Sequence, residues 1–420
     1  MRAGVGTALT MALPDGIARS GATERVSARL AAIPCDDRVE DGGPSHAGSG
    51  VVGFGSLPFD RAARGTVTVP ALIVGRDGNG PEWITVVGHD LPPLPPEPKE
   101  HRAWLGNRIP TMGEADPQSS RKGAPPASPM IEPRISDETF EAMVARALGE
   151  IRQGGLKKVV LSRQVDVIMD RPIALPTLLS RWMVLEPGCG FFSVPTGERQ
   201  FVGASPELLV ERSGTAMRTR PLAGTSGRRG GTEGGGYGAL LRSGKEGNEH
   251  RLVVEAIAAA LAPFCSTLSV PRGPDLVQLH NLAHLGTALD GTLAPRGDGS
   301  VPTALDLVAV LHPTPAVAGV PTLAAERLIA DVEAGPRGHY AGPVGFVDAS
   351  GDGTWMIGIR AISVEGARAR LSAGVGVVDG SDPKSEREEA DLKLTAVFDA
   401  LAPGCAFSTA VAADRRRAVS

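Results

Sequence analysis

The chain contains two pairs of glutamates, and within each pair the two residues are three positions apart in a segment whose pattern is helical. Glu246 and Glu249 lie in SGKEGNEH, and Glu386 and Glu389 lie in SEREEADLK, shortly before Lys393. Residues three apart share one face of a helix, so each pair presents two carboxylates together. Hard cations such as Mg²⁺ take oxygen ligands, and two pairs could hold one ion from opposite sides. A single acidic run is also typical of a solvated helix start, which the helix dipole favours.

Two other residues are suited to proton transfer. Lys158 opens the apolar run VVL directly after a predicted helix, and Glu207 precedes an apolar run in GASPELL. Burial lowers the pKa of a lysine and raises the pKa of a carboxyl group, which suits a base and a general acid respectively. Each residue also has a plainer interpretation: a lysine whose ammonium reaches solvent, and a carboxylate in a turn.

Arg360 lies in the alternating strand pattern MIGIRAISV. An arginine among apolar residues needs an anion, which can be a protein carboxylate or a substrate carboxylate. His284, in NLAHLG, is more typical of a hydrogen-bonded core histidine than of a metal ligand. A base, an acid, a carboxylate cluster and an anion-binding arginine together indicate Mg²⁺-assisted chemistry on a small anionic substrate.

The composition argues against several classes of function. The chain has 420 residues with a net charge of −4 and 4% aromatic residues, so nucleic acid is not the expected partner. Its four cysteines are far apart and lack metal or redox spacing. No run of about 18 apolar residues occurs, so no membrane association is expected. We therefore expect a cytoplasmic protein, and we find no nucleotide-binding fingerprint or Ser-His-Asp triad pattern.

The elements that position these residues follow from apolar periodicity and from glycine and proline breaks. A helix is predicted from Ser136 or Asp137 to the glycines at 154 and 155, and others over 243–261 and 384–402. Runs of strands with helices between them, without a βαβ rhythm, predict an α+β fold with large antiparallel sheets and helices on their outer faces.

The domain organisation is predicted from the distribution of proline and glycine. A proline-rich, irregular connection over 90–133 separates a variable N-terminal portion, 1–133, from a catalytic core, 134–405, and we assign both to one domain, 1–420. The glycine-rich segment 230–238 is predicted to be a mobile loop.

From about Lys158 to Leu401 the chain resembles the chorismate-utilising enzymes, a superfamily that includes isochorismate, salicylate, anthranilate and aminodeoxychorismate synthases. The blocks that carry this resemblance are KVVLSR, FVGASPELL, RPLAGTSGRRG, SGKEGNEH, LAHLGT, LHPTPAVAGVP, PRGHYAGPVGF, IGIRA, LSAGVGVV and SDPKSEREEADLK. The N-terminal portion matches only loosely, through GFGSLPFD. The resemblance implies a fold of two stacked antiparallel β-sheets with helices on the outer faces.

The resemblance also implies roles for individual residues. Lys158 matches the lysine that activates water, and Glu207 matches the general acid that protonates the leaving hydroxyl. The residues matched to Mg²⁺ are Glu249 and Glu389 as direct ligands and Glu246 and Glu386 as their supports. The candidates for substrate binding are Tyr340 and Arg360 for the enolpyruvyl carboxylate, Lys393 for a further carboxylate, and Gly224, Thr225, His284, Ala316, Gly374 and Gly376 around the substrate.

The branch of the superfamily follows from three positions. Relatives that use ammonia usually carry glutamine in place of Lys158, since ammonia needs no such base, whereas water does. Ala223 replaces the nucleophilic lysine of the aminodeoxychorismate branch, and Ala316 replaces a threonine common in salicylate synthases. The resemblance therefore implies a Mg²⁺-dependent isochorismate synthase that acts on chorismate without a glutamine amidotransferase.

Two other functions stay open. A salicylate synthase would add pyruvate elimination at the same site, and a silent subunit would only bind chorismate or Mg²⁺. Members of this type are often monomeric, so we expect a monomer. Isochorismate can serve siderophore or menaquinone synthesis, and the sequence does not distinguish these.

Overall fold

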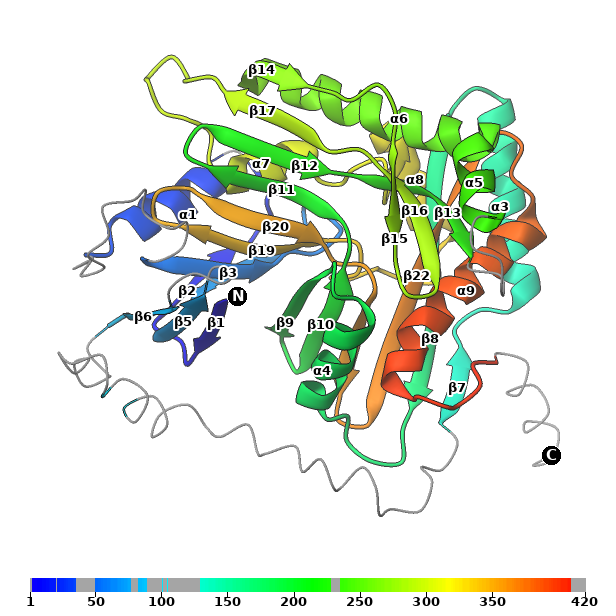
Figure 1. Cartoon of the computed structure of the whole chain (residues 1–420), viewed down its shortest axis with the longest axis horizontal. Coiled ribbons are helices and arrows are strands. Elements are labelled where there is room, and N and C mark those ends of the chain that lie inside the picture. The colour runs from blue at the N-terminus through cyan, green and yellow to red at the C-terminus, as the bar shows by residue number, and fades with distance from the viewer. Residues whose placement is uncertain are drawn as a thin grey trace.

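The computed structural model describes residues 2–19, 21–34, 50–76, 82–88, 100, 104, 129–227 and 235–408. Two large sheets dominate these residues, and neighbouring strands in both are antiparallel (Figure 1). The predicted α+β fold of large antiparallel sheets is therefore confirmed.

The nine-stranded sheet joins strands from both ends of the chain. Its order is β14 (Cys265–Ser269), β17 (Leu289–Leu293), β12 (Ala216–Arg220), β11 (Leu208–Ser213), β20 (Gly353–Ile357), β19 (Pro343–Asp348), β3 (Val52–Ser56), β4 (Gly65–Val69) and β2 (Leu9–Leu13). The N-terminal strands enter through the pairing of β3 with β19. The predicted boundary at residue 133 thus separates strands that share one sheet, and the assignment of the chain to one domain stays a prediction.

The seven-stranded sheet carries the long strand that begins at Lys158. Its order is β18 (Gly319–Val320), β8 (Lys158–Ile168), β22 (Arg368–Val378), β21 (Ala361–Glu365), β10 (Arg199–Ser205) and β9 (Gly190–Thr196), with β7 (Met130–Pro133) paired to β8. Strands β8 and β22 pair over the whole length of both, so Lys158 lies opposite Val378. The connection predicted as irregular over 90–133 lies largely outside the described residues, and its end forms β7 because Met130–Pro133 pairs with β8.

Two small sheets complete the strand structure. The first consists of β1 (Arg2–Val5), β5 (Leu72–Arg76) and β6 (Glu82–Val86), and the second of β13 (Leu222–Gly227), β16 (Leu282–Gly286) and β15 (Asp275–Gln278). The second lies beside α6 and α9 (Figure 1), so it brings the segment around Gly224 close to both predicted carboxylate pairs.

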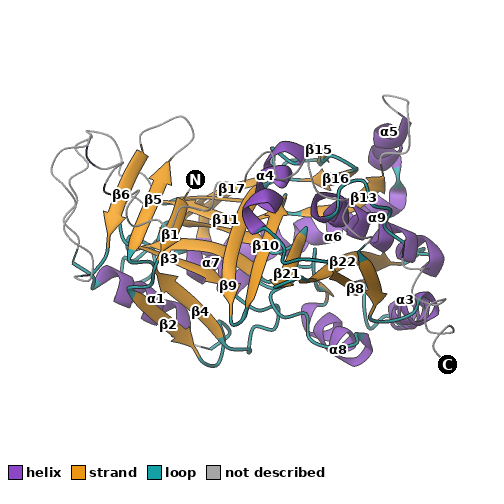
Figure 2. Ribbon diagram, turned by 90° about the horizontal axis from the view of Figure 1, so that it is seen from below, coloured by secondary structure: helices purple, strands orange, loops and turns teal. Residues whose placement is uncertain are grey.

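The helices lie on the outside of the sheets (Figure 2). They are α1 (Ala22–Ala31), α3 (Asp137–Arg152), α4 (Leu175–Leu185), α5 (Gly235–Arg242), α6 (Gly244–Leu261), the 3₁₀ turn η1 (Ala262–Phe264), α7 (Ala304–Leu311), α8 (Thr322–Val332) and α9 (Pro383–Leu401). One continuous hydrophobic core contains Leu161 of the seven-stranded sheet and Trp355 of the nine-stranded sheet, both fully buried. None of the helices in the described ranges has the length and apolar character needed to cross a membrane.

The serines at the predicted helix starts do cap α3 and α6. Ser136 caps α3 by accepting a hydrogen bond from the N–H of Thr139, and Ser243 caps α6 in the same way. The loop prediction for 230–238 was wrong from Gly235 onward, since α5 begins there. Leu240 of α5 is buried against the strands of the second small sheet, and this packing outweighs the low helix propensity of glycine.

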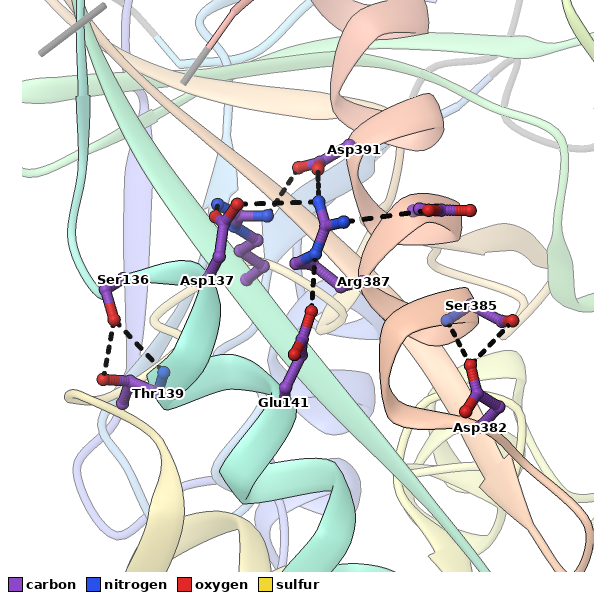
Figure 3. Close-up of polar contacts among 10 residues, drawn as sticks. Ser136, Asp137, Thr139, Glu141, Asp382, Ser385, Arg387 and Asp391 are labelled. Atoms are coloured by element: carbon purple, nitrogen blue, oxygen red, sulfur yellow. Dashed lines mark hydrogen bonds and ion pairs between the residues drawn. The ribbon is translucent and has the colours of Figure 1, made fainter. Parts of the chain in front are cut away.

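A network of ion pairs attaches α9 to α3 and to β8. The guanidinium of Arg163, fully buried on β8, contacts the carboxylates of Asp137 and Asp391. Arg387 of α9 donates to Glu141 at 2.9 Å and to Asp391 at 3.0 Å, and Figure 3 shows it reaching across to α3. Because α9 carries the second glutamate pair, this network fixes the position of that pair against the sheet.

We expect Arg163→Met to lower the free energy of unfolding by about 2 kcal/mol, because it removes hydrogen bonds between charged groups from a buried position, while Asp137 and Asp391 keep Arg387 as a partner. Urea denaturation measures this loss. The control is Arg146→Met, which removes an exposed ion pair between Arg146 of α3 and Asp331 of α8 and should cost less than about 1 kcal/mol. Equal losses in the two variants would contradict a special role for the buried network.

Candidate active site

An open cavity lies where α6, α9 and the ends of several strands meet. Most of the predicted site residues line it, and these are Glu207, Gly224, Thr225, Glu249, His284, Ala316, Tyr340, Arg360, Gly374, Gly376 and Lys393. The other predicted residues, which are Lys158, Glu246, Glu386 and Glu389, lie outside this lining. Lys158, Glu246 and Glu389 contact the lining residues Glu249, Thr225 and Lys393 respectively, and Glu386 is linked to Glu246 through Lys245. Residues spread over more than 230 positions of sequence are therefore gathered around one space.

Lys158 is fully buried at the first position of β8. Its Nζ lies 3.0 Å from Oε1 of Glu249, and among the described residues it makes no hydrogen bond of good geometry. The contact is therefore an ion pair that leaves the donor directions of the ammonium group unsatisfied. The amine contacts Glu249, which lines the cavity. An amine held in such a position is suited to exchange a proton with a bound water molecule.

Glu207 is buried in the turn between β10 and β11. Burial raises the pKa of its carboxyl group to about 8, and the opposing influence of Lys158 and Lys393 is smaller. Glu207 thus keeps its proton at neutral pH, which is the state that a general acid requires. The expectation of a carboxyl group in an apolar setting agrees with this geometry.

The two glutamate pairs lie on adjoining helices with lysines among them. Glu246 accepts a hydrogen bond from the N–H of Thr225 at 2.9 Å. Nζ of Lys393 lies 2.7 Å from Oε1 of Glu389 and also donates to the carbonyl of Gly374 at 2.8 Å. Within the ranges that the structure describes, no three acidic, histidine or cysteine side chains lie close enough together to hold a metal ion as they stand.

The pKa values of the glutamates reflect mutual repulsion. Burial, and then the neighbouring carboxylate of Glu389, raise the pKa of Glu386 to about 7. Burial and Glu249 raise the pKa of Glu246 in the same way. Burial also acts to raise the pKa of Glu389, but the ammonium of Lys393 lowers it overall. The cluster therefore holds more negative charge than its surroundings neutralise easily.

Arg360 presents a guanidinium to the cavity without a carboxylate partner. No ion pair joins it to any acidic side chain in the described part of the chain, and its Nε is buried without a hydrogen-bond partner. Its Nη2 donates to Nε2 of His284 at 2.9 Å. Arg360 and Ala341 are the non-glycine residues with positive φ among those described, 51° and 63°, and both line the cavity. Such strained backbone is typical of functional sites.

His284 is buried at the cavity, and both of its ring nitrogens have hydrogen-bond partners. Burial, and then the charge of Arg360, hold the pKa of its imidazole well below the ordinary value, so the ring is neutral. Its Nδ1 lies 3.2 Å from the carbonyl of Gly224 and 3.2 Å from Oγ1 of Thr225. With the proton on Nδ1 donated to that carbonyl, Nε2 is free to accept from Arg360 and orient it.

Two glycines of β22 leave room for functional side chains. A Cβ on Gly376 would lie 2.0 Å from Oε1 of Glu249, and a Cβ on Gly374 would lie 3.1 Å from the hydroxyl of Tyr340. Any larger residue at Gly376 would displace a carboxylate from the site. These contacts explain why the LSAGVGVV block needs small residues at these positions.

Two residues that belong to the site were not predicted. Lys245 lies between Glu246 and Glu386, with its Nζ 3.3 Å and 2.6 Å from their Oε1 atoms. Arg337 lines the cavity and donates to the carbonyls of Val317 and Val160, both at 2.7 Å. Both lie in sequence blocks that carry the family resemblance, SGKEGNEH and PRGHYAGPVGF. Their closeness in sequence to predicted site residues was the signal that could have identified them.

Comparison with known proteins places this site in a family. The family model described as chorismate binding enzyme matches residues 3–402, and so includes the N-terminal portion that the motifs matched only loosely. Isochorismate synthase DhbC of Bacillus subtilis is 40% identical over 281 residues, which cover 64% of this chain and 69% of that protein.

Two solved structures share the fold over nearly the whole chain. DhbC from Bacillus anthracis superposes with a TM-score of 0.73 and 28% identity, covering 95% of this chain and 93% of its own. MenF, the menaquinone-specific isochorismate synthase from Escherichia coli, superposes with a TM-score of 0.73 and 25% identity, covering 95% and 85%. From the cavity, the ordered motifs and these matches, we conclude that this chain belongs to the family of chorismate-binding enzymes.

Proposed function

We propose that the protein is an isochorismate synthase, which converts chorismate to isochorismate. The observation that carries this proposal is the combination of a fully buried Lys158, whose Nζ lies 3.0 Å from Oε1 of the cavity-lining Glu249, with a Glu207 that retains its proton and lines the same cavity. A protein that only bound chorismate would need neither a buried amine nor a proton-holding carboxyl group. The name of the Bacillus subtilis relative agrees with this assignment.

The proposed reaction is a substitution with a shift of double bonds. In the neutral amine form that a base requires, Lys158 takes a proton from water, and the oxygen of that water forms a bond to C2 of the ring. The ring double bonds move, the bond between C4 and its hydroxyl breaks, and Glu207 gives its proton to the departing hydroxyl. One water enters and one leaves, so the product is an isomer of the substrate. Each proton transfer contributes on the order of 10²–10⁴-fold in rate.

The residues present fit a magnesium ion. Among the described residues, Oε2 of Glu386 is buried without a hydrogen-bond partner, and after burial the carboxylates of Glu389 and Glu249 raise the pKa values of Glu386 and Glu246 respectively. These are hard oxygen donors that lack a sufficient counter-charge, which is the chemistry that Mg²⁺ satisfies. Glu249 and Glu389 would hold the ion, with Glu246 and Glu386 as their supports. When bound, the ion supplies charge neutralisation and orientation for a ring carboxylate.

Arg360 and Tyr340 are placed to hold the second carboxylate, which belongs to the enolpyruvyl group. Burial raises the pKa of Tyr340 to about 12, so its hydroxyl stays a neutral hydrogen-bond donor. The guanidinium of Arg360 has no protein carboxylate to compete with the substrate among the described residues. This arrangement supports a substrate carboxylate as the anion that Arg360 binds.

We expect Arg360→Met to raise KM for chorismate about 10- to 100-fold, because a hydrogen bond to a charged group contributes about 1.5–3 kcal/mol. Steady-state kinetics with saturating Mg²⁺ measure KM and kcat separately. Arg368→Met removes an exposed arginine from the neighbouring strand β22 and should leave KM unchanged. A loss confined to kcat would show that Arg360 does not bind the ground-state substrate.

Product analysis tests the proposed function directly. Purified protein is incubated with chorismate and Mg²⁺, and the products are separated by chromatography. Isochorismate without salicylate or pyruvate, formed with no added amidotransferase, supports the proposal. Salicylate together with pyruvate would assign the salicylate synthase reaction, and bound but unconverted chorismate would assign a silent subunit. Light scattering on the same sample tests the proposed monomer.

A further inference from the structure

Lys245 belongs to α6, and among the described lysines it is the one whose Nζ pairs with a glutamate of each helix. Its Nζ lies 2.6 Å from Oε1 of Glu386 on α9 and 3.3 Å from Oε1 of Glu246 on α6. Lys158 and Lys393, by contrast, each pair with a single glutamate. Lys245 thus supplies the positive charge that joins the two carboxylate pairs in the absence of a metal ion.

The exposure of the partners shows which of them can move. The side chain of Lys245 is 30% exposed, whereas that of Glu386 is 1% exposed. A lysine at the edge of the site can swing its ammonium into water at little cost, because its chain is long and flexible. The carboxylate of Glu386 cannot reach water in this way, and its Oε2 has no hydrogen-bond partner among the residues that the structure describes. Glu386 therefore stays in place and needs a cation beside it, whereas the ammonium group of Lys245 can move away from Glu386 into water.

We propose that Lys245 is the resident counter-ion of the glutamate cluster and competes with the divalent ion for Glu386 and Glu246. This inference rests on the Mg²⁺ site of the proposed function. Lys245 stabilises the metal-free protein and weakens its affinity for metal, because an ammonium beside the carboxylates both neutralises them and repels an incoming cation. The chain would thereby avoid an uncompensated cluster of buried carboxylates before metal and substrate arrive.

The first test measures metal binding by the substrate-free protein. We expect Lys245→Met to bind Mn²⁺ at least about 10-fold more tightly than the unaltered protein. Removing a positive charge beside the carboxylates that would hold the ion relieves a repulsion larger than the free energy of one tenfold step in affinity. Electron paramagnetic resonance of free Mn²⁺ gives the dissociation constant, and displacement by Mg²⁺ shows that the two ions share the site. Lys245→Arg keeps the charge and should retain the weaker affinity.

The second test measures thermal unfolding with and without metal. Lys245→Met should unfold at a lower temperature than the unaltered protein in the presence of a chelator, and Mg²⁺ should raise its unfolding temperature by a larger amount. Lys245→Gln is a second neutral variant that keeps a hydrogen-bond donor for Glu386. The control is Arg251→Met, which removes an exposed positive charge from the same helix, where Arg251 pairs with Glu255.

The outcomes separate this inference from the proposed function. Unchanged or weaker Mn²⁺ binding by both neutral variants overturns the role of Lys245, even if the unaltered protein makes isochorismate. An equal gain in affinity for Arg251→Met also overturns it, because the effect would then come from net charge alone. If no variant binds Mn²⁺, the competition is overturned, and the product analysis with chorismate decides the proposed function independently.

Discussion

Lys158→Met is expected to lower kcat by at least about 100-fold, because it removes the group that deprotonates water. Methionine has nearly the length of lysine, so it fills the buried position on β8 without leaving a cavity. KM for chorismate should change little, since Lys158 does not line the cavity that receives the substrate. Steady-state kinetics at saturating Mg²⁺, with folding checked by circular dichroism, measure the effect.

The adjacent residue provides the control. Lys157 is exposed, so Lys157→Met removes the same charge one position earlier and should leave kcat unchanged. Near-normal turnover by Lys158→Met would exclude Lys158 as the base. Because Lys158 also neutralises Glu249, its loss leaves a buried carboxylate without a partner, and the variant should be less stable in the absence of metal.

Glu207→Gln is expected to reduce kcat by at least about 100-fold, because the amide has the same shape but cannot donate a proton to the leaving hydroxyl. Glu211→Gln, at an exposed position on the following strand β11, is the matched control and should have normal activity. A Glu207→Gln variant with full turnover would show that another group protonates the hydroxyl.

The same carboxyl group predicts a pH dependence of activity. With its pKa raised to about 8 by burial, Glu207 is protonated and competent below that pH and loses its proton above it. We therefore expect kcat/KM of the unaltered enzyme to fall as the pH rises through about 8, since kcat/KM reports groups of the free enzyme. The small residual activity of Glu207→Gln should lack this decline.

The raised pKa of Glu207 also affects stability, with a definite sign. Its pKa in the folded protein exceeds the unfolded value of 4.5, so folding takes up a proton between that value and about pH 8. This contribution is complete at low pH and is lost as the pH rises through 8. Urea denaturation at pH 9 should therefore show Glu207→Gln to be more stable than the unaltered protein, a trade of stability for function.

Much of the site could be predicted because its signals are local. The spacing of Glu246 from Glu249 and of Glu386 from Glu389 already placed each pair on one helical face, and a serine near position 136 marked the beginning of the helix α3 that packs against α9. The burial of Glu207 could be anticipated from the apolar residues that follow it. These features depend on residues within one or two turns of each other, which periodicity and composition describe directly.

Contacts between distant segments could not be predicted in this way. The sequence showed that Arg360 needs an anion, but only packing reveals that it contacts His284 and has no carboxylate partner among the described residues. The helix at Gly235–Arg242 was missed because its stability comes from the burial of Leu240 against a sheet, and not from its glycine-rich sequence.

By itself, the sequence determined the types of chemical group, their order in the chain and the family to which the motifs point. The tertiary structure decided which charges neutralise one another: Lys158 with Glu249, and Lys245 with Glu386 on another helix. Sequence spacing carries no information about such pairs, because they form only when the sheets and helices pack together. Those pairings control which groups hold protons and which carboxylates remain available to a cation, and so they govern the chemistry of the site.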